Sequence, residues 1–494
     1  MNAIGFDNDK YLDMQSKHIK ERIEQFGGKL YLEFGGKLFD DYHASRVLPG
    51  FKPDSKITML KTLKDKTEIV IAIKAGDIEK NKVRGDIGIT YDIDVLRLID
   101  AFTNNGLFVG SVVLTQFSET PPVLAYEKKL KALGIKCYRH YKIDGYPSNI
   151  PMIVSDEGFG RNDYIETTRP LVVVTAPGPG SGKMAACLSQ LYHESKRGIE
   201  AGYAKFETFP IWNLPLNHPV NLAYEAATAD LNDVNMIDPF HLEAYGETVV
   251  NYNRDVEVFP VLKAMFEKIS GSSPYQSPTD MGVNMAGHCI CDDEVCRTAS
   301  NQEIIRRYYH ALCDKRRGTG GDSPIAKIEL LMEKAGISVA DRPVVKAANI
   351  RAEKTGNPAA AICMADGTVL TGKTSSLLGA SSAMLLNALK YLAGIDDPAK
   401  LISPRVIEPV MELKVKHLGN HNPLLHIDEM LIALAIEAID NPEAKAAYDM
   451  LPGLKGLDVH SSVILSEVDV GVFKKLGINL TCEPKYESNK LYHT

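Results

Sequence analysis

The stretch Leu171-Val-Val-Val-Thr-Ala-Pro-Gly-Pro-Gly-Ser-Gly-Lys-Met-Ala185 decides the fold. Its β-branched run predicts a buried strand over 171–175, and a helix is expected over 184–194. Between them, glycines allow successive backbone N–H groups to converge on an anion, while the helix N-terminus and a lysine add positive charge. We therefore predict a phosphate-binding loop, with this set of contacting residues: Gly178, Gly180, Ser181, Gly182 and Lys183.

This segment departs from the Walker form G-x-x-x-x-G-K-[ST] at two positions. Pro177 stands at the first glycine position, and Met184 stands where a hydroxyl residue normally binds Mg²⁺. A nucleotide bound here would have its metal held by other groups, or would bind without one. The alternative is a tight strand-to-helix turn that binds nothing.

A second segment, Gly367-Thr-Val-Leu-Thr-Gly-Lys-Thr374, fits the Walker form without a mismatch. Its context predicts a different structure, because 359–364 and 368–370 read as two strands joined by a tight turn at Asp366-Gly367. Asp366 would also repel a phosphate. A helix over 375–393 follows, so weak anion binding at Gly372–Ser375 stays open, but we rank the imperfect match first.

Composition is that of an ordinary globular protein. The chain has 494 residues, 45% of them hydrophobic and 24% charged, with a net charge of −7 and interspersed signs. This balance argues against a nucleic-acid partner. Eight scattered cysteines, the lack of a signal-peptide pattern and the lack of an apolar run of membrane-spanning length indicate a cytoplasmic protein without a membrane partner.

Strand and helix signals alternate through the first half of the chain. Strands are expected over 68–74, 107–114, 135–140, 171–175, 203–210 and 234–237, with helices over 92–104, 122–133, 184–194 and 220–229. This order predicts an α/β fold with a doubly wound, mostly parallel sheet, whose ligands bind beyond the carboxyl ends of the strands.

Two turn-rich segments divide the whole chain into three parts. We predict an α/β phosphate- or nucleotide-binding domain over 1–270, a helical connector over 271–324, containing a helix over 292–315, and a separate C-terminal α/β subdomain over 325–494. The last part is expected to hold the hairpin, helices over 404–416 and 426–439, and a strand over 458–465.

Two further groups of residues are candidates for anion or metal contacts. Lys37, His43 and Arg46 follow Gly35-Gly36 and suit a second anion site, although solvated turn residues explain them equally well. Asp238 follows a short apolar stretch, as a metal-positioning catalytic aspartate does, but it also precedes Pro239 and suits a helix N-cap better.

Histidines and cysteines cluster in two other places. Asn420, His421 and His426 lie in a loop with Gly and Pro and are substrate-contact candidates. The spacing of Cys289, Cys291 and Cys296 is not that of a zinc site, so we expect packing and no metal. Neither H-E-x-x-H nor G-x-S-x-G occurs, and the zinc-deaminase ligand motifs are absent.

Five segments carry a resemblance to a known family: 48–54, 85–91, 175–183, 277–284 and 458–462. On these segments the whole chain resembles the bacterial family known as domain of unknown function 1846. The resemblance implies an α/β nucleotide-binding-type core with a distinct C-terminal subdomain. Some members carry the label ATP-dependent peptidase, but no peptidase signature supports that activity here.

Two main hypotheses about function follow. The first is an enzyme that binds ATP or another phosphorylated metabolite at 178–183 and transfers or hydrolyses a phosphoryl group, with Asp238 supporting a metal such as Mg²⁺. The second is a sensor that binds a phosphorylated metabolite without chemistry, which Met184 favours. Sugar-phosphate or nucleoside metabolism is a third possibility, and a homo-oligomer is plausible.

Overall fold

The computed structural model describes residues 3–36, 38–85, 87–396 and 398–487, and the chain forms two compact units. The N-terminal unit comprises residues 4–224 and 233–296. The C-terminal unit comprises residues 225–232 and the chain from residue 297 onward. Because the first unit extends to residue 296, part of the segment predicted as a connector belongs to it.

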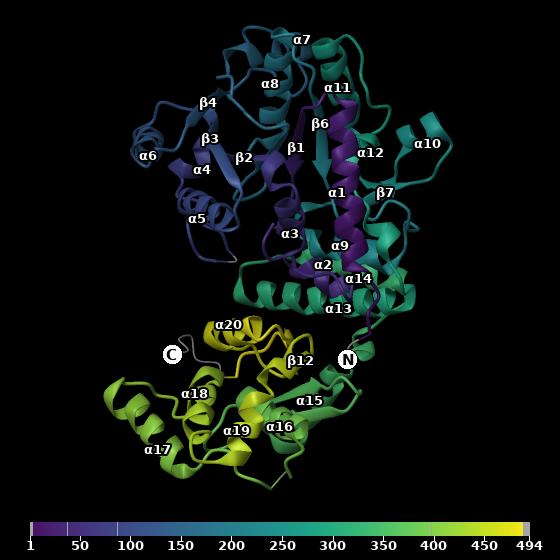
Figure 1. Ribbon diagram of the computed structural model, residues 1–494. Coiled ribbons are helices and arrows are strands. Elements are labelled where there is room, and N and C mark those ends of the chain that lie inside the picture. Colours follow the sequence, from purple (N-terminus) through teal and green to yellow (C-terminus); the bar gives the residue numbers. More distant parts are fainter. Residues whose placement is uncertain (1–2, 37, 86, 397, 488–494) are drawn as a thin grey trace. The chain divides into compact units, whose positions relative to one another are not determined.

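A seven-stranded sheet forms the centre of the N-terminal unit, with helices on both of its faces (Figure 1). All its neighbouring strands are parallel, which confirms the α/β class with a mostly parallel sheet. In spatial order the strands are β4 (Cys137–Tyr141), β3 (Phe108–Phe117), β2 (Thr67–Lys74), β5 (Leu171–Thr175), β1 (Leu30–Phe34), β6 (Gly202–Phe206) and β9 (Gly282–Val283).

The chain winds through this sheet in both directions. It passes from β1 to β2, β3 and β4 at one edge, then returns to the centre at β5 and continues to β6 and β9 at the other edge. β9 lies in the segment predicted as a helical connector and was not expected from the sequence. The strands β1, β2 and β5 are buried along almost their whole length.

The predicted helices of this unit are present, with slightly different ends. They are α5 (Tyr91–Asn104), α6 (Pro121–Ala132), α8 (Lys183–Lys196) and α9 (Pro219–Ala227). Two long helices, α1 (Asn8–Gln25) and α11 (Asn253–Ser270), were not predicted. α1 begins at the N-cap Asp7, whose carboxylate accepts from Lys10 N at 3.0 Å, and it buries polar as well as apolar residues.

α8 is fastened to the sheet by a buried carboxylate near its C-terminal end. Glu194 is fully buried, and its Oε1 accepts from the Tyr31 hydroxyl at 2.5 Å and pairs with Lys29 Nζ at 2.5 Å. Helical spacing puts Lys183, Cys187 and Glu194 on one face of α8. The contact to β1 therefore orients the whole sheet-facing side of the helix, including its first residue.

The short strand expected over 234–237 was wrongly assigned to the alternating α/β series. β7 (Asn235–Ile237) pairs antiparallel with β8 (Val250–Tyr252) in a separate two-stranded sheet. The apolar stretch of β7 is too short to indicate which strand it pairs with. The sequence pattern therefore predicted an extended conformation, but it could not predict the sheet to which the strand belongs.

The C-terminal unit contains a mixed four-stranded sheet. The hairpin expected at Asp366-Gly367 is confirmed, since β10 (Ala359–Cys363) and β11 (Val369–Lys373) pair antiparallel and Gly367 has a φ of 86°. β12 (Asp458–Ser461), shorter than expected, lies beside β10, and the unpredicted β13 (Asn479–Cys482) runs parallel to β12.

Helices cover this sheet and form its apolar core. They are α15 (Pro343–Thr355), α16 (Ala380–Ala393), α17 (Pro404–Glu412), α18 (Ile427–Glu437), α19 (Pro442–Asp449) and α20 (Glu467–Lys475). The core includes Met384, Leu385, Leu434 and Phe473. The long helix α13 (Asp293–Arg317) precedes these elements, and α14 (Asp322–Ala335) follows it.

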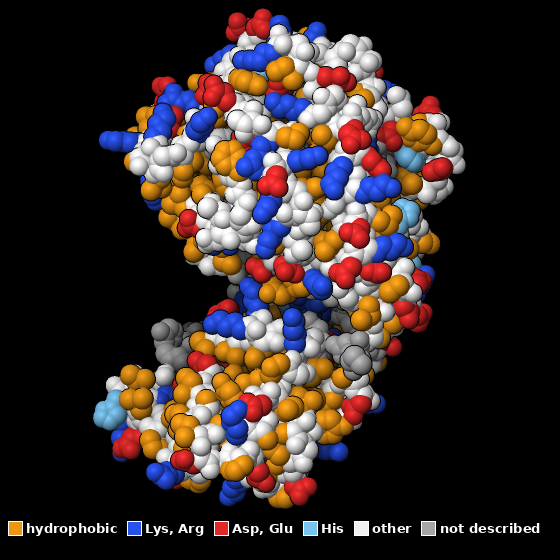
Figure 2. All heavy atoms as spheres, viewed as in Figure 1, with side chains coloured by type: hydrophobic (Ala, Val, Ile, Leu, Met, Phe, Trp, Pro, Cys, Tyr) orange, Lys and Arg blue, Asp and Glu red, His pale blue; other side chains and the backbone are white. Residues whose placement is uncertain are grey.

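Acidic and basic side chains are interspersed on the face drawn in Figure 2, as the composition suggested. Among the residues that the structure describes, no helix is both long enough and apolar enough to cross a membrane.

Replacing Glu194 by Ala should destabilise the N-terminal unit by about 3 kcal/mol, because the partly buried ammonium of Lys29 would lose its counter-charge and the buried Tyr31 hydroxyl its acceptor. Chemical denaturation of the full chain measures the change. Glu157→Ala is the matched control, since Glu157 is exposed, and it should stay within about 0.5 kcal/mol of the parent. Equal stability of the two variants would show that Glu194 does not fasten α8.

Candidate functional site

The centre of the parallel sheet contains its topological switch point. β5 and β1 are neighbours in register, with Val174 beside Glu33, so both strands end at the same edge of the sheet. From β1 the chain continues toward one side of the sheet, and from β5 toward the other. Sheets of this kind bind ligands at such an edge. The structure therefore brings the starts of two predicted loops together, Gly35-Gly36 after β1 and 176–182 after β5.

The loop after β5 is held by contacts of its own backbone. Ser181 is fully buried, and its hydroxyl donates to the carbonyl oxygen of Gly178 at 2.9 Å. The carbonyl oxygen of Ser181 accepts from Thr115 Oγ1 of β3 at 2.7 Å. Gly180 and Gly182 have φ angles of 72° and 82°, which favour glycine. The Ser181 hydroxyl, predicted to contact a ligand, is thus engaged within the loop.

Gly178 is required by a neighbouring loop. A Cβ atom at this position would lie 2.3 Å from the hydroxyl of Tyr91, the first residue of α5. Lys82 Nζ lies 4.7 Å from the centroid of the Tyr91 ring. Tyr91, the last residue of segment 85–91 that carries the family resemblance, therefore packs against the glycine-containing loop.

Lys183 is the first residue of α8 and follows Gly182, which caps the helix in a left-handed conformation. Among the described residues, its ammonium group makes no ion pair or hydrogen bond. It lies near enough to Cys187 to lower that thiol's pKa, although burial and Glu33 together raise the pKa well above its usual value. The loop thus ends at a helix N-terminus in a cation that has no ion-pair or hydrogen-bond partner within the described part of the chain.

The segment after β1 contains a buried ion pair. Asp41 caps α2 (Tyr42–Val47) by accepting from Ala44 N at 3.1 Å, and it pairs with Lys56 Nζ at 2.7 Å. Burial opposes ionisation of Asp41, but Lys56 holds its pKa below the usual value. A Cβ at Gly36 would lie 3.5 Å from Lys56 Nζ, so a second ammonium group lies beside this loop.

The other candidates in this segment are placed as follows. His43 and Arg46 lie on α2 and are partly buried, and the His43 ring lies edge-on to Phe209, with the ring centroids 5.2 Å apart. Phe209 follows β6, so α2 packs near the carboxyl end of that strand. Lys37 lies outside the described residues.

A cluster of ionisable groups that sequence analysis missed lies at the carboxyl end of β6. Lys205 Nζ pairs with Glu207 Oε1 at 2.9 Å and also contacts Asp255 Oδ2 and the Tyr252 hydroxyl. All four residues are buried or nearly so. Burial is the largest cause that raises the pKa of Glu207 to about 7, against the opposing effect of Lys205. We call these four residues the Lys205 cluster.

The sequence contains no direct signal for this cluster. Lys205 and Glu207 lie inside the strand predicted over 203–210, and only the earlier end of β6 at Phe206 brings them to the carboxyl edge, where ligand sites of parallel sheets lie. Tyr252 and Asp255 come from β8 and α11, and nothing in the sequence links them to β6.

Asp238 is the N-cap of α10 (Pro239–Tyr245), as the favoured alternative predicted. Its Oδ1 accepts from the backbone N–H groups of Phe240 and His241, both at 3.0 Å, and its Oδ2 accepts from Thr279 Oγ1 at 2.7 Å. The side chain is fully buried. Both carboxylate oxygens are therefore occupied, and a catalytic role stays a prediction without geometric support.

The three histidine-loop candidates lie in the C-terminal unit. His426 caps α18, and its Nδ1 lies 3.0 Å from Asp469 Oδ2. This hydrogen bond to Asp469 raises the pKa of His426 above its usual value, against the effect of burial. His421 is exposed and Asn420 is partly buried. The structure gives His426 a structural partner, and all three residues belong to the C-terminal unit.

The segment that fits the Walker form without a mismatch does not form a cradle. Its glycine at 372 lies in β11, opposite Ala360, and a Cβ there would lie 2.2 Å from the backbone nitrogen of Met384 in α16. Gly372 therefore permits close packing of helix on strand. Structural context ranks the two matches in the order that the sequence context suggested.

The three clustered cysteines differ in environment. Cys289 and Cys296 are buried, and burial raises the pKa of their thiols to about 11 and about 12. Cys291 is exposed. In the described part of the chain, no group of three or more His, Cys, Asp or Glu side chains is placed to hold a metal ion.

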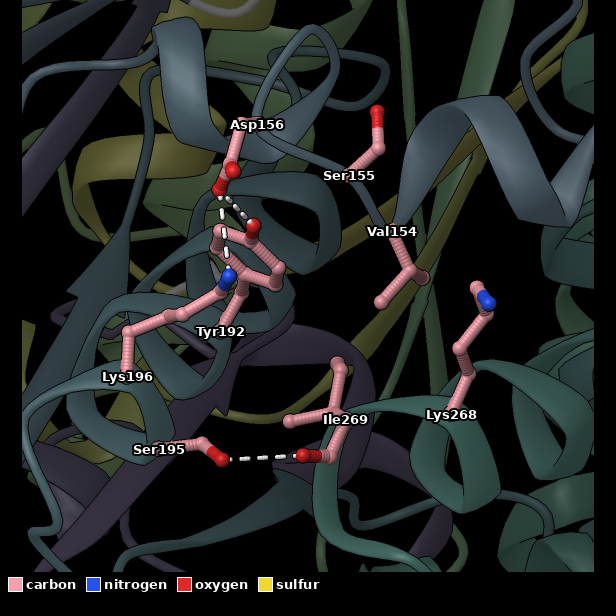
Figure 3. Close-up of a pocket in the computed structure, with 8 residues that line it drawn as sticks. All are labelled: Val154, Ser155, Asp156, Tyr192, Ser195, Lys196, Lys268 and Ile269. Atoms are coloured by element: carbon pink, nitrogen blue, oxygen red, sulfur yellow. Dashed lines mark hydrogen bonds and ion pairs between the residues drawn. The ribbon is translucent and has the colours of Figure 1, made fainter.

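A pocket of about 330 Å³ lies near the other end of α8. In Figure 3, Lys196 and Tyr192 point to the carboxylate of Asp156, with Lys196 Nζ at 3.2 Å and the Tyr192 hydroxyl at 2.5 Å. Lys268 lines the opposite side. Because Lys196 is thirteen residues beyond Lys183, the pocket is roughly 20 Å along the helix from the glycine-containing loop.

Comparison with known proteins identifies the family. The family model for the N-terminal part of domain of unknown function DUF1846 matches residues 4–336 of the chain. The model for the C-terminal part of DUF1846 matches residues 340–492. The chain belongs to this family.

Similar proteins in other bacteria extend over the full length. A UPF0371 protein of Corynebacterium urealyticum is 61% identical over 492 residues, which cover 99% of each chain. A UPF0371 protein of Streptococcus pyogenes is 58% identical over 492 residues, which cover 100% of each chain. The DUF1846 architecture is thus shared over both units, and neither family name states an activity.

Asp469→Asn should lower the pKa of His426, because the neutral amide no longer favours the imidazolium. The pair stabilises the C-terminal unit while His426 is protonated and Asp469 is ionised, and this stability is lost as the pH rises through the pKa of folded His426. NMR titration of the imidazole C–H signals measures the shift. Asp440→Asn, at an exposed position of the same unit, is the control and should leave the titration of His426 unchanged.

Proposed function

We propose that the protein binds a small phosphorylated ligand, ATP or another phosphorylated metabolite, on loop 178–183. The observation that carries the proposal is Lys183, an ammonium without a partner among the described residues, at the start of a helix and at the switch point of a parallel sheet. Ligands of such sheets bind at this position. The proposal is independent of the Walker sequence itself.

The backbone of the loop suits an anion. The first intrahelical bond of α8 is donated by Ala186 N to Gly182 O, so the N–H groups just before it have no helical acceptor. These groups and the helix dipole favour a negative charge, and Lys183 adds a full positive charge. Lys56, beside Gly36, supplies further positive charge at the adjacent strand end, although Asp41 neutralises much of it.

Three roles are compatible with this site: phosphoryl transfer or hydrolysis, sensing of a metabolite, and sugar-phosphate chemistry. Met184 replaces the hydroxyl that would bind Mg²⁺, which favours a ligand bound without a metal held by this loop. Phosphoryl transfer or hydrolysis would then depend on a metal bound mainly by the ligand. A sensor of a phosphorylated metabolite needs neither a metal nor a reaction at the phosphate. A sugar-phosphate enzyme needs acid–base groups near the loop.

Lys183→Ala should weaken ligand binding by about 1.5–3 kcal/mol, roughly ten- to a hundred-fold, because a charge-assisted contact is lost. Calorimetric titration with nucleotides and sugar phosphates, each with Mg²⁺ and with EDTA, measures the change. Lys196→Ala is the matched control from the other end of α8, and it should bind as the parent does.

The control also tests the pocket in Figure 3. Loss of binding in Lys196→Ala, with Lys183→Ala unaffected, would place the ligand in that pocket and contradict the proposal. Magnesium-dependent binding would favour the phosphoryl-transfer form, and equal binding in EDTA would favour the sensor or the sugar-phosphate enzyme.

A further inference from the structure

The Lys205 cluster has an excess of negative charge for a buried group. One ammonium faces two carboxylates, those of Glu207 and Asp255, together with the hydroxyl of Tyr252. A buried structural ion pair needs one carboxylate for each ammonium, and a further buried charge is costly. The cluster therefore favours holding a proton on one carboxyl group, and Glu207 is the group whose pKa burial raises to about 7.

The groups that face Glu207 come from several elements. Lys205 lies on the same strand, Asp255 on α11, Tyr252 on β8 and Tyr224 on α9. Glu33 of β1 is in register with Lys205 and acts on it electrostatically. Only Lys205 opposes protonation of Glu207, while Asp255 favours it. These neighbours suit a carboxyl group that exchanges its proton near neutral pH.

The cluster shares the carboxyl edge of the sheet with the glycine-containing loop. β6 is separated from β5 by β1 alone, so their ends lie roughly 10 Å apart along the edge, at about 4.8 Å between neighbouring strands. After β1 the chain continues into Gly35-Gly36, which have no side chains of their own, and Lys56 Nζ lies beside Gly36. A small ligand with its phosphate above β5 can therefore extend across β1 toward Glu207.

We propose that Glu207 is the acid–base group of a catalytic site for sugar phosphates, short hydroxylated carbon chains with a carbonyl group, held by their phosphate on loop 178–183. This proposal rests on the proposed function and adds to it a substrate class and a reaction class. The distance between the two strand ends matches the length of a pentose or hexose phosphate better than that of a nucleoside triphosphate.

The reaction is a proton transfer that needs no outside oxidant or reductant. The Glu207 carboxylate takes a proton from the carbon next to the carbonyl, the C–H electron pair forms a C=C bond, and the carbonyl π pair moves to oxygen. Lys205, an ammonium in contact with the same cluster, stabilises the oxyanion. Glu207 then returns the proton. At the same carbon this restores the substrate, and at the former carbonyl carbon it gives the isomer, as the neighbouring hydroxyl passes its proton to the oxyanion and becomes the new carbonyl.

The first measurement uses sulfate, whose charge does not change between pH 6 and 8. As Glu207 ionises with rising pH, its negative charge about 10 Å away should weaken sulfate binding about four-fold or more. Calorimetric titrations compare the parent with Glu207→Gln, in which this pH dependence should decrease, and Glu257→Gln, an exposed control on α11. The comparison separates the effect of Glu207 on the pH dependence of sulfate binding from any effect of the nearby imidazole of His43. Lys183→Ala should weaken sulfate binding at every pH.

The second measurement follows deuterium incorporation from D₂O into ribose 5-phosphate and fructose 6-phosphate by NMR. Glu207→Gln should slow incorporation at least a hundred-fold and leave sulfate binding at pH 6 intact. Glu207→Asp keeps a carboxylate but shortens its reach, so incorporation should fall while the pH dependence of sulfate binding stays.

The outcomes distinguish the two proposals. Sulfate binding that needs Lys183, with no pH difference between parent and Glu207→Gln and no deuterium incorporation by the parent, overturns the acid–base site and leaves the proposed function standing. Sulfate binding unaffected by Lys183→Ala overturns both. Deuterium incorporation that depends on Glu207 and Lys183 together supports both.

Discussion

The parallel pairing of β5, β1 and β6 is the constraint on which the candidate site depends. Because neighbouring parallel strands end at one edge, this pairing brings loop 178–183, Gly35-Gly36 and Glu207 into one line, although they are up to 172 residues apart in the chain. The winding reverses between β1 and β5, so the helices that follow them leave toward opposite sides. Under the proposed function, a ligand at this edge would lie near groups that follow three neighbouring strands.

Buried charges make this arrangement rigid as well as reactive. Glu194 fastens the C-terminal half of α8 to β1 through Tyr31 and Lys29, and the Lys205 cluster occupies the carboxyl end of β6, beside β1. Each buried charge must be matched, since an unmatched one costs several kcal/mol. Glu194 is matched by Lys29, but the single ammonium of Lys205 faces two carboxylates, those of Glu207 and Asp255. Glu194, matched by Lys29, is therefore a structural contact. The additional carboxylate beside Lys205 is the group that we propose for proton exchange.

Local signals predicted the frame of the N-terminal unit well. The β-branched run 171–175 coincides with β5, and glycines and charges at the helix ends located α5, α6 and α8 within a few residues. Polar helices were missed, because α1 buries residues such as Gln15 and Ser16 and therefore lacks a clear apolar stripe. The glycine-containing loop was found because its residues are contiguous. The Lys205 cluster was not, because Lys205 and Asp255 meet only after β6 and α11 have packed together.

The two Walker-like segments show why spacing alone does not determine a site. Residues 367–374 have the right letters, but β-branched residues between the glycines extend the backbone, and the strand pairs in a hairpin. Residues 177–184 differ from the Walker form at both ends, but they follow a buried parallel strand and open a helix at Lys183, which pairs with none of the residues that the structure describes. Met184 then has a consistent explanation. A loop that anchors the phosphate of a ligand whose chemistry takes place above β6 needs a cation and backbone N–H groups, but it does not need to hold Mg²⁺ for an attack on that phosphate.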